Sequence, residues 1–349
     1  MRKCMDRNRT IDVAKGIAIL MIIDVHLQSG AVFLVGETFH VVTFFVISGI
    51  IIGSDKKKYE KETIYSFAVK KIKSLIYPYG TMSILFILFM VFISLLKDNS
   101  LFSDRVSSAV IKAVTFQGVG TLWFLPVLFF AELIAFAYSK IFRRFGGIQW
   151  AICMGVIAVY ISWLFEKCEL PEGIMLMLSS SIAAGFIAIG YDISPFFYKL
   201  SVKSRKHLFT VIVGSLSMFF INKYFVRFYE ADIHILKIGD PAIYFVCSMS
   251  GVVFALALSC IFSYVKWLDS LFSFLGKNSL IIMTTHKEYY ITYAVYLFLL
   301  KAFGGSCGQL LFGLLSLVLI VTIELILILI ITKTPLKYLY KLPEINIKR

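Results

Sequence analysis

The chain has 349 residues, of which 59% are hydrophobic and 16% charged, and its formal net charge is +14 at pH 7. A soluble domain carries about 25% charged residues, so this composition excludes an ordinary soluble protein and indicates a membrane protein. The positive charge does not indicate a nucleic-acid partner. The sequence has no helix-turn-helix or aromatic-basic RNA motif, and membrane proteins concentrate Lys and Arg in cytoplasmic loops.

Apolar windows of about 20 residues predict about ten membrane-spanning helices in one all-α domain, residues 1–349. The predicted spans are 11–30, 38–54, 75–97, 120–140, 148–166, 173–191, 208–223, 241–263, 279–300 and 309–331. Lys and Arg are in excess in alternate connecting segments, so the positive-inside rule places both termini in the cytoplasm. Residues 264–278 are expected to form a connecting loop. We therefore expect a polytopic helix bundle.

The first predicted helix carries ionisable side chains, which are costly inside a membrane and are therefore candidates for a functional site. Lys15 and His26 are separated by about three helical turns, so they lie on one face of the helix, about 16 Å apart. With a cytoplasmic N-terminus, Lys15 lies near the inner leaflet and His26 lies in the middle or outer half of the bilayer. Imidazole titrates near neutral pH, so His26 is a candidate general base.

The second predicted helix begins with His40 at its outer end. Ser48 and Gly49 follow in this helix as small residues, and we interpret them as packing residues. The next segment is rich in lysine, which topology and anionic lipid explain for much of its length. Lys70 and Lys73, however, lie one turn apart on a predicted helix, and a fixed pair of cations at a membrane entrance suits phosphate groups.

Trp123 begins the fourth predicted helix, and Glu132 follows about 13 Å deeper. An intramembrane glutamate needs a partner, so Glu132 has either a structural ion pair or a catalytic role. The ninth predicted helix places His286 about 10 Å inside the membrane, followed by Lys287 and Glu288. His234 falls in a predicted loop and is expected to be exposed.

His26, His40 and His286 come from three different predicted helices. Three histidines can bind zinc, but no pair has the short spacing of a metal motif, so no metal is expected. If the three converge, acyl transfer is the other chemistry they suit. A hydroxyl needs a general base to attack a thioester, and the developing oxyanion needs a hydrogen-bond donor.

Five stretches of the sequence carry a family resemblance: IDVAKGIAILMIIDVH, FHVVTFFVISG, KKIKSLIYPY, LWFLPVLFFAELI and GKNSLIIMTTH. In this order, across about residues 11–290, they resemble the integral-membrane acyltransferases of the acyltransferase 3 family, most of all its fucose 4-O-acetylase-like branch. Many members have arginine where this chain has Lys15, and an ammonium group does not reproduce the bidentate fork of a guanidinium.

The resemblance implies an O-acyltransferase in the bacterial plasma (inner) membrane. It would move an acetyl group from cytoplasmic acetyl-CoA to a hydroxyl of a cell-surface or lipid-linked glycan, with membrane lipid around it. The residues expected to serve in catalysis are His26, His286, His40 and Glu132. Those expected to hold the donor are Lys15, Lys70, Lys73 and Trp123. Lys287, Trp123 or a second histidine would stabilise the oxyanion.

Two alternatives stay open at this point. The first is a transporter or flippase of a glycan or lipid intermediate, with the buried charges along its path, although no inverted repeat supports it. The second is transfer of another acyl group, such as succinyl, by the same kind of protein.

Overall fold

The computed structural model describes residues 9–27, 39–97, 101–142, 146–168, 170–201, 208–226, 231–303 and 308–342. Within these ranges the chain is helical, and its extended pairing is limited to one β-bridge between Asp232 and Lys237. Six helical runs in the described ranges are long and apolar enough to cross a membrane. The all-α membrane architecture is therefore confirmed, whereas the count of ten spans and the cytoplasmic termini stay predictions.

The spanning runs are Ile64–Leu95, Gly120–Ile141, Gly147–Leu164, Glu172–Lys199, Pro241–Phe262 and Gln309–Lys333. The α-helices are α1 (Arg9–Val25), α2 (His40–Ser54), α3 (Lys56–Lys61), α4 (Ile64–Lys71), α5 (Tyr77–Lys97), α6 (Leu101–Val114), α7 (Phe124–Ile141), α8 (Trp150–Leu164), α9 (Glu172–Ser201), α10 (Leu208–Val226), α11 (Pro241–Phe262), α12 (Lys266–Lys277), α13 (Ser279–Thr285), α14 (Ile291–Phe303) and α15 (Gln309–Lys333). Short turns are the π-helical η1 (Ile72–Ile76) and the 3-10 turns η2 (Gly120–Trp123), η3 (Gly147–Gln149) and η5 (Pro335–Leu339).

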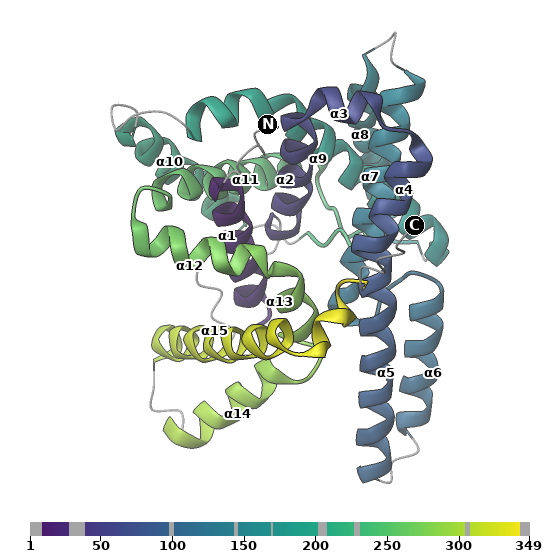
Figure 1. Ribbon diagram of the computed structural model, residues 1–349, viewed down its shortest axis with the longest axis vertical. Helices are drawn as coiled ribbons and strands as arrows, with labels where there is room; N and C mark the ends of the chain where they lie inside the picture. Colours follow the sequence, from purple (N-terminus) through teal and green to yellow (C-terminus); the bar gives the residue numbers. More distant parts are fainter. Residues whose placement is uncertain are drawn as a thin grey trace, which may run out of the picture.

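The longest helical run joins α4, η1 and α5, so the predicted span 75–97 is only its second half. In Figure 1, α5 and α6 lie side by side and extend beyond the rest of the molecule, while α15 runs crosswise to α5. The segment after α15 returns to the start of α5. There the Tyr77 hydroxyl donates to the Tyr338 carbonyl at 2.7 Å, and the Thr81 hydroxyl donates to the Leu339 carbonyl at 2.5 Å.

Glycines bring α1 and α2 into backbone contact with their neighbours, α12 and α9. A Cβ added at Gly16 would lie 2.1 Å from a backbone oxygen of α12, and one at Gly276 would lie 1.8 Å from a backbone oxygen of α1. A Cβ at Gly49 would lie 1.9 Å from a backbone oxygen of α9, so its interpretation as a packing residue is confirmed. These close approaches fix α1 and α2, and thereby His26 at the end of α1 and His40 at the start of α2.

Two predictions about the C-terminal third are wrong. Residues 279–300 do not form one helix, because the chain breaks at 286–290 between α13 and α14, where Tyr290 has a φ of 60°. Residues 264–278 are not a loop but contain the amphipathic helix α12. The polar residues of this helix lower the mean hydropathy of the segment, so an apolar window does not detect it. The break places His286 at the end of a short helix rather than inside a long one.

Candidate functional site

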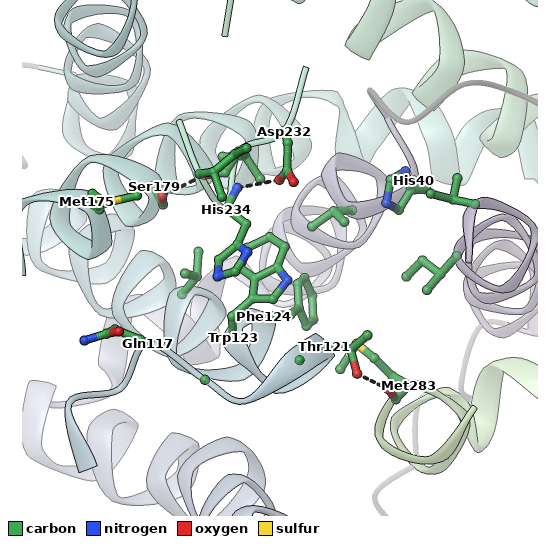
Figure 2. A pocket seen from close by; sticks show the side chains of 18 of the residues that line it. His40, Gln117, Thr121, Trp123, Phe124, Met175, Ser179, Asp232, His234 and Met283 are labelled. Atoms are coloured by element: carbon green, nitrogen blue, oxygen red, sulfur yellow. Dashed lines mark hydrogen bonds between the residues drawn. The ribbon is translucent and has the colours of Figure 1, made fainter. Parts of the chain in front are cut away.

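A cavity of about 720 Å³ lies between the end of α1, the start of α2, the η2 turn and the segment 231–235. The residues on its wall that can donate or accept protons include three histidines, one tryptophan and two lysines: His26, His40, His234, Trp123, Lys112 and Lys287. Figure 2 shows the Trp123 and His234 rings stacked in this cavity, with His40 and Thr121 on its walls. The α9 helix and the segment 231–235 complete the enclosure.

His26, which lines the cavity, forms a hydrogen-bonded pair with His286 behind it. Nδ1 of His26 lies 3.0 Å from Nε2 of His286, and the ring centroids are 5.1 Å apart. His286 is fully buried, and its other nitrogen, Nδ1, lies 2.7 Å from the Ile282 carbonyl oxygen one turn earlier. His26 is half-buried and faces the cavity.

The hydrogen bonds of this pair determine its tautomers when both imidazoles are neutral. A carbonyl oxygen only accepts, so Nδ1 of His286 carries a hydrogen and donates to Ile282. Nε2 of His286 is then bare and accepts the hydrogen bond from Nδ1–H of His26. His26 is left with a bare Nε2, which is an atom that can accept a proton.

His40 lines the same cavity from the start of α2 but does not complete a three-histidine centre. Among the residues described above, no three His, Cys, Asp or Glu side chains are grouped as metal ligands. His26 has His286 as its neighbour, and His40 lies on a separate part of the wall. The hydrogen-bonded pair of His26 and His286 is a geometry that suits proton transfer.

Trp123 stacks on His234, with ring centroids 4.7 Å apart and planes 15° from parallel. The expectation that His234 is exposed is wrong, since its ring is half-buried in the cavity. Its backbone N–H donates to Asp232 Oδ1 at 2.8 Å, and the buried Ser179 hydroxyl donates to the neighbouring Ile233 carbonyl at 2.8 Å. Burial lowers the pKa of His234, and the nearby Asp232 carboxylate opposes this shift. The apolar residues of this segment, among them the buried Ile233, are the sequence signal of this burial.

Glu132 lies outside the cavity lining, in an ion pair. Its Oε1 is 2.8 Å from Lys71 Nζ and accepts a hydrogen bond from the Ser48 hydroxyl. Ser48 therefore makes a polar contact in addition to packing. Glu132 is about 13 Å further along α7 than Trp123. The structure does not bring it together with the histidine pair.

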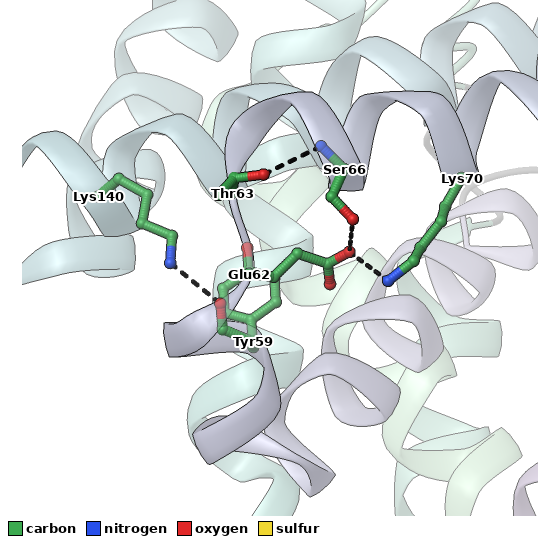
Figure 3. A network of polar contacts seen from close by, with 6 residues as sticks. All are labelled: Tyr59, Glu62, Thr63, Ser66, Lys70 and Lys140. Atoms are coloured by element: carbon green, nitrogen blue, oxygen red, sulfur yellow. Dashed lines mark hydrogen bonds and ion pairs between the residues drawn. The ribbon is translucent and has the colours of Figure 1, made fainter.

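A cluster of lysines surrounds a shallow pocket of about 570 Å³ at the α3–α4 connection: Lys57, Lys58, Lys61 and Lys70. Lys70 forms an ion pair with Glu62, which also accepts from the Ser66 hydroxyl at 3.2 Å (Figure 3). Burial raises the pKa of Glu62, but the hydrogen bonds from Lys70 and Ser66 and the charges of Lys70 and Lys58 lower it, and the net shift is downward. Lys73 is exposed on η1 and does not line this pocket.

The lysine cluster and the cavity lie at opposite ends of the same helices. Lys140, in the last turn of α7, donates to the carbonyls of Tyr59 and Glu60 at 3.1 and 2.7 Å, as Figure 3 shows for Tyr59. Trp123, at the other end of α7, is about 25 Å away along the helix axis. The predicted donor ligand Lys70 is therefore not adjacent to His26. Lys15 is half-buried on α1, about 16 Å before His26 along the helix.

The acyltransferase domain of the acyltransferase 3 family matches residues 8–331, a range that contains both the cavity and the lysine cluster. No curated protein and no solved structure matches the chain. The family match covers nearly the whole sequence and agrees with the apolar, multi-pass helical structure. The chain thus belongs to the acyltransferase 3 family and is a multi-pass membrane acyltransferase.

Proposed function

We propose that the protein transfers an acetyl group from cytoplasmic acetyl-CoA to a hydroxyl of a cell-surface or lipid-linked glycan, in a bacterial plasma membrane. The fucose 4-O-acetylase-like branch is the part of the family that its motifs resemble most. The observation that carries the proposal is the His26–His286 pair, which leaves a bare Nε2 on the wall of a cavity in a chain of this family. A neutral imidazole in this position is suited to deprotonate a hydroxyl.

In the proposed reaction, Nε2 of His26 takes the proton of the acceptor hydroxyl as the hydroxyl oxygen attacks the thioester carbon. A C–O bond forms and the C–S bond breaks. The proton then passes from His26 to the departing sulfur, so that the ester and free coenzyme A are the products. His286 positions His26 and does not act as a second base, because both of its nitrogens are hydrogen-bonded.

The oxyanion of this reaction needs a donor in the cavity. Both nitrogens of His286 are engaged, which leaves the Lys287 ammonium and the Trp123 indole N–H as the donors suggested by the sequence. His40, on the same wall, is proposed to bind the acceptor. These roles place the acceptor between α2 and the η2 turn.

The donor is proposed to bind with its phosphates near Lys70 and Lys73 and its thioester at His26. Along α2 this route covers about 21 Å, which requires an extended donor. The Lys71–Glu132 ion pair lies between the two ends, so Glu132 would act on the donor path. Lys15 is proposed to lie on the same route, about 16 Å from His26 along α1.

The proposal is tested by transfer of radiolabelled acetyl from acetyl-CoA to glycan in membranes. His26→Ala is expected to reduce transfer by about 10²- to 10⁴-fold. Matched amounts of monodisperse wild-type and variant protein control for insertion. Unchanged transfer by His26→Ala would refute the role of His26. No thioester consumption by the wild type would favour the transporter alternative, and labelling from succinyl-CoA but not acetyl-CoA would identify a different acyl donor.

A further inference from the structure

Glu288 connects the helix break at 286–290 to the turn that carries Trp123. Its side chain is buried, and Oε1 accepts the backbone N–H of Thr121 at 2.6 Å and the Thr121 hydroxyl at 2.8 Å. Thr121 lies in η2, on the cavity wall, two residues before Trp123. A buried carboxylate without hydrogen bonds is costly, so these two contacts hold the carboxylate and the turn to each other.

The turn has two glycines where other residues would not fit. Gly120 has a φ of +56°, and a Cβ there would lie 2.1 and 2.2 Å from the two carboxylate oxygens of Glu288. Gly118 has a φ of +79°, and a Cβ there would lie 2.1 Å from the backbone nitrogen of Trp123. Glycine adopts this left-handed backbone without steric cost and leaves room for the carboxylate. Glu288 therefore lies directly against the backbone of the turn.

The same helix break also positions the base. His286 accepts the hydrogen bond of His26, Lys287 lines the cavity, and Glu288 holds the η2 turn. The Thr121 hydroxyl lies 2.8 Å from the Met283 carbonyl as well, so the turn also contacts α13 just before the break. One short segment thus sets the position of His26 on one wall and of Trp123 on another.

We propose that Glu288 is a positioning residue for acyl transfer, which holds the Gly118–Trp123 turn so that Trp123 keeps its place relative to His26. The kinetic part of this inference rests on the proposed function. The positional part does not, because it concerns the environment of Trp123 in the resting protein.

The positional part is tested by fluorescence of a protein in which Trp123 is the only tryptophan, after Trp150→Phe, Trp163→Phe and Trp267→Phe. Glu288→Ala is expected to shift Trp123 emission to the red and to increase its quenching by acrylamide. Glu288→Gln keeps an acceptor oxygen for Thr121 and is expected to retain the wild-type signal. If Glu288→Ala does not fold, Thr121→Ala, which removes one of the two contacts, is expected to give a smaller shift in the same direction.

Glu324→Ala is the matched control. Glu324 is fully buried and accepts from the Thr285 hydroxyl at 2.7 Å, but it does not line the cavity. Its replacement is expected to lower thermal stability and leave Trp123 emission unchanged. Equal emission changes in Glu288→Ala and Glu324→Ala, or no change in Glu288→Ala and Thr121→Ala, would overturn the proposal.

The kinetic part is tested by steady-state acetyl transfer. Displacement of a site group by about 1 Å costs on the order of 10²-fold in rate, so Glu288→Ala is expected to lose about that factor in kcat, with Glu288→Gln largely restored. A stable, folded Glu288→Ala with wild-type kcat and KM would overturn the positioning role. Absence of transfer by the wild type would instead refute the proposed function, while the fluorescence result would still decide the positional part.

Discussion

At the scale of single residues, the direction of the hydrogen bonds around His286 matters more than its proximity to the cavity. The Ile282 carbonyl fixes the hydrogen on Nδ1 of His286, and this in turn requires His26 to donate through its own Nδ1. The atom that is left to react, Nε2 of His26, is thus selected by a backbone carbonyl two contacts away. The hydrogen bonds of His286 therefore decide which nitrogen of His26 is free to accept a proton.

Replacement of His286 tests this selection. His286→Ala is expected to lower kcat by about 10²-fold with little change in the KM for the acceptor, because it frees the ring of His26. His286→Gln can still offer an amide oxygen to Nδ1–H of His26, so it is expected to recover part of the lost kcat. Steady-state kinetics of purified protein would measure both, and identical rates for Ala and Gln would contradict the tautomer argument.

His234 gives a pH dependence with a definite sign. Burial lowers its pKa, while in the unfolded chain a histidine titrates near its ordinary value of about 6.5. The unfolded state therefore binds more protons below that value, and stability falls as the pH drops from about 7 to about 5. His234→Phe keeps a ring on Trp123 without this titration. The apparent Tm of His234→Phe in detergent is expected to fall less than that of the wild type over this range. An equal fall in both proteins would contradict the role of His234 in the pH dependence.

At the scale of secondary-structure elements, backbone contact at glycines sets where α1 presents His26. Gly276→Ala would place a Cβ 1.8 Å from a backbone oxygen of α1, so the two helices must separate. Overpacking of this kind costs about 1–3 kcal/mol, and the expected result is a clear loss of thermal stability. Gly80→Ala is the matched control, because its Cβ would meet nothing within 4 Å. Equal Tm values for the two variants would show that α1 and α12 can move apart without a loss of stability.

The short helices α3 and α4 present the lysine cluster, and there Glu62 forms an ion pair with Lys70, the proposed ligand of the donor phosphates. Glu62→Gln removes this competitor and is expected to lower the KM for acetyl-CoA by about two- to five-fold, the range of an exposed ion pair. Glu60→Gln changes the formal charge equally, in the neighbouring helix. Kinetics with varied donor concentration would compare the two variants. An equal effect of both would show that the negative charge of Glu62 matters, and not its ion pair with Lys70.

At the scale of the whole molecule, the sequence predicted the segments and faces but not the long-range partners. Apolar windows identify the helical stretches, and helical periodicity relates Lys15 to His26 on one face. The pairing of His26 with His286 spans 260 residues, and no periodic pattern contains it. The break after α13 is not detected by apolar windows either, because the residues before and after it are apolar. The burial of His234 was missed because its partner, Trp123, lies far away in the sequence and no local pattern relates the two rings.

The separation of the lysine cluster from the cavity predicts access from opposite sides of the membrane. Lys61 lines the pocket in the cluster and Gln117 lines the cavity. In a cysteine-free background, Lys61→Cys is expected to react with an impermeant maleimide in inside-out vesicles, and Gln117→Cys in right-side-out vesicles. Reaction of both from one side would contradict a donor and an acceptor that enter from different compartments.

The 260-residue separation within the histidine pair also concerns biosynthesis. The helix with His26 leaves the ribosome before His286, which follows after about 13–50 s at 5–20 residues per second. Until then the imidazole of His26 has no fixed tautomer and α1 has no α12 to pack on. A nascent or truncated chain that lacks His286 would therefore insert in the bilayer before its histidine pair exists, and the proposed transfer could begin only after α13 has been synthesised.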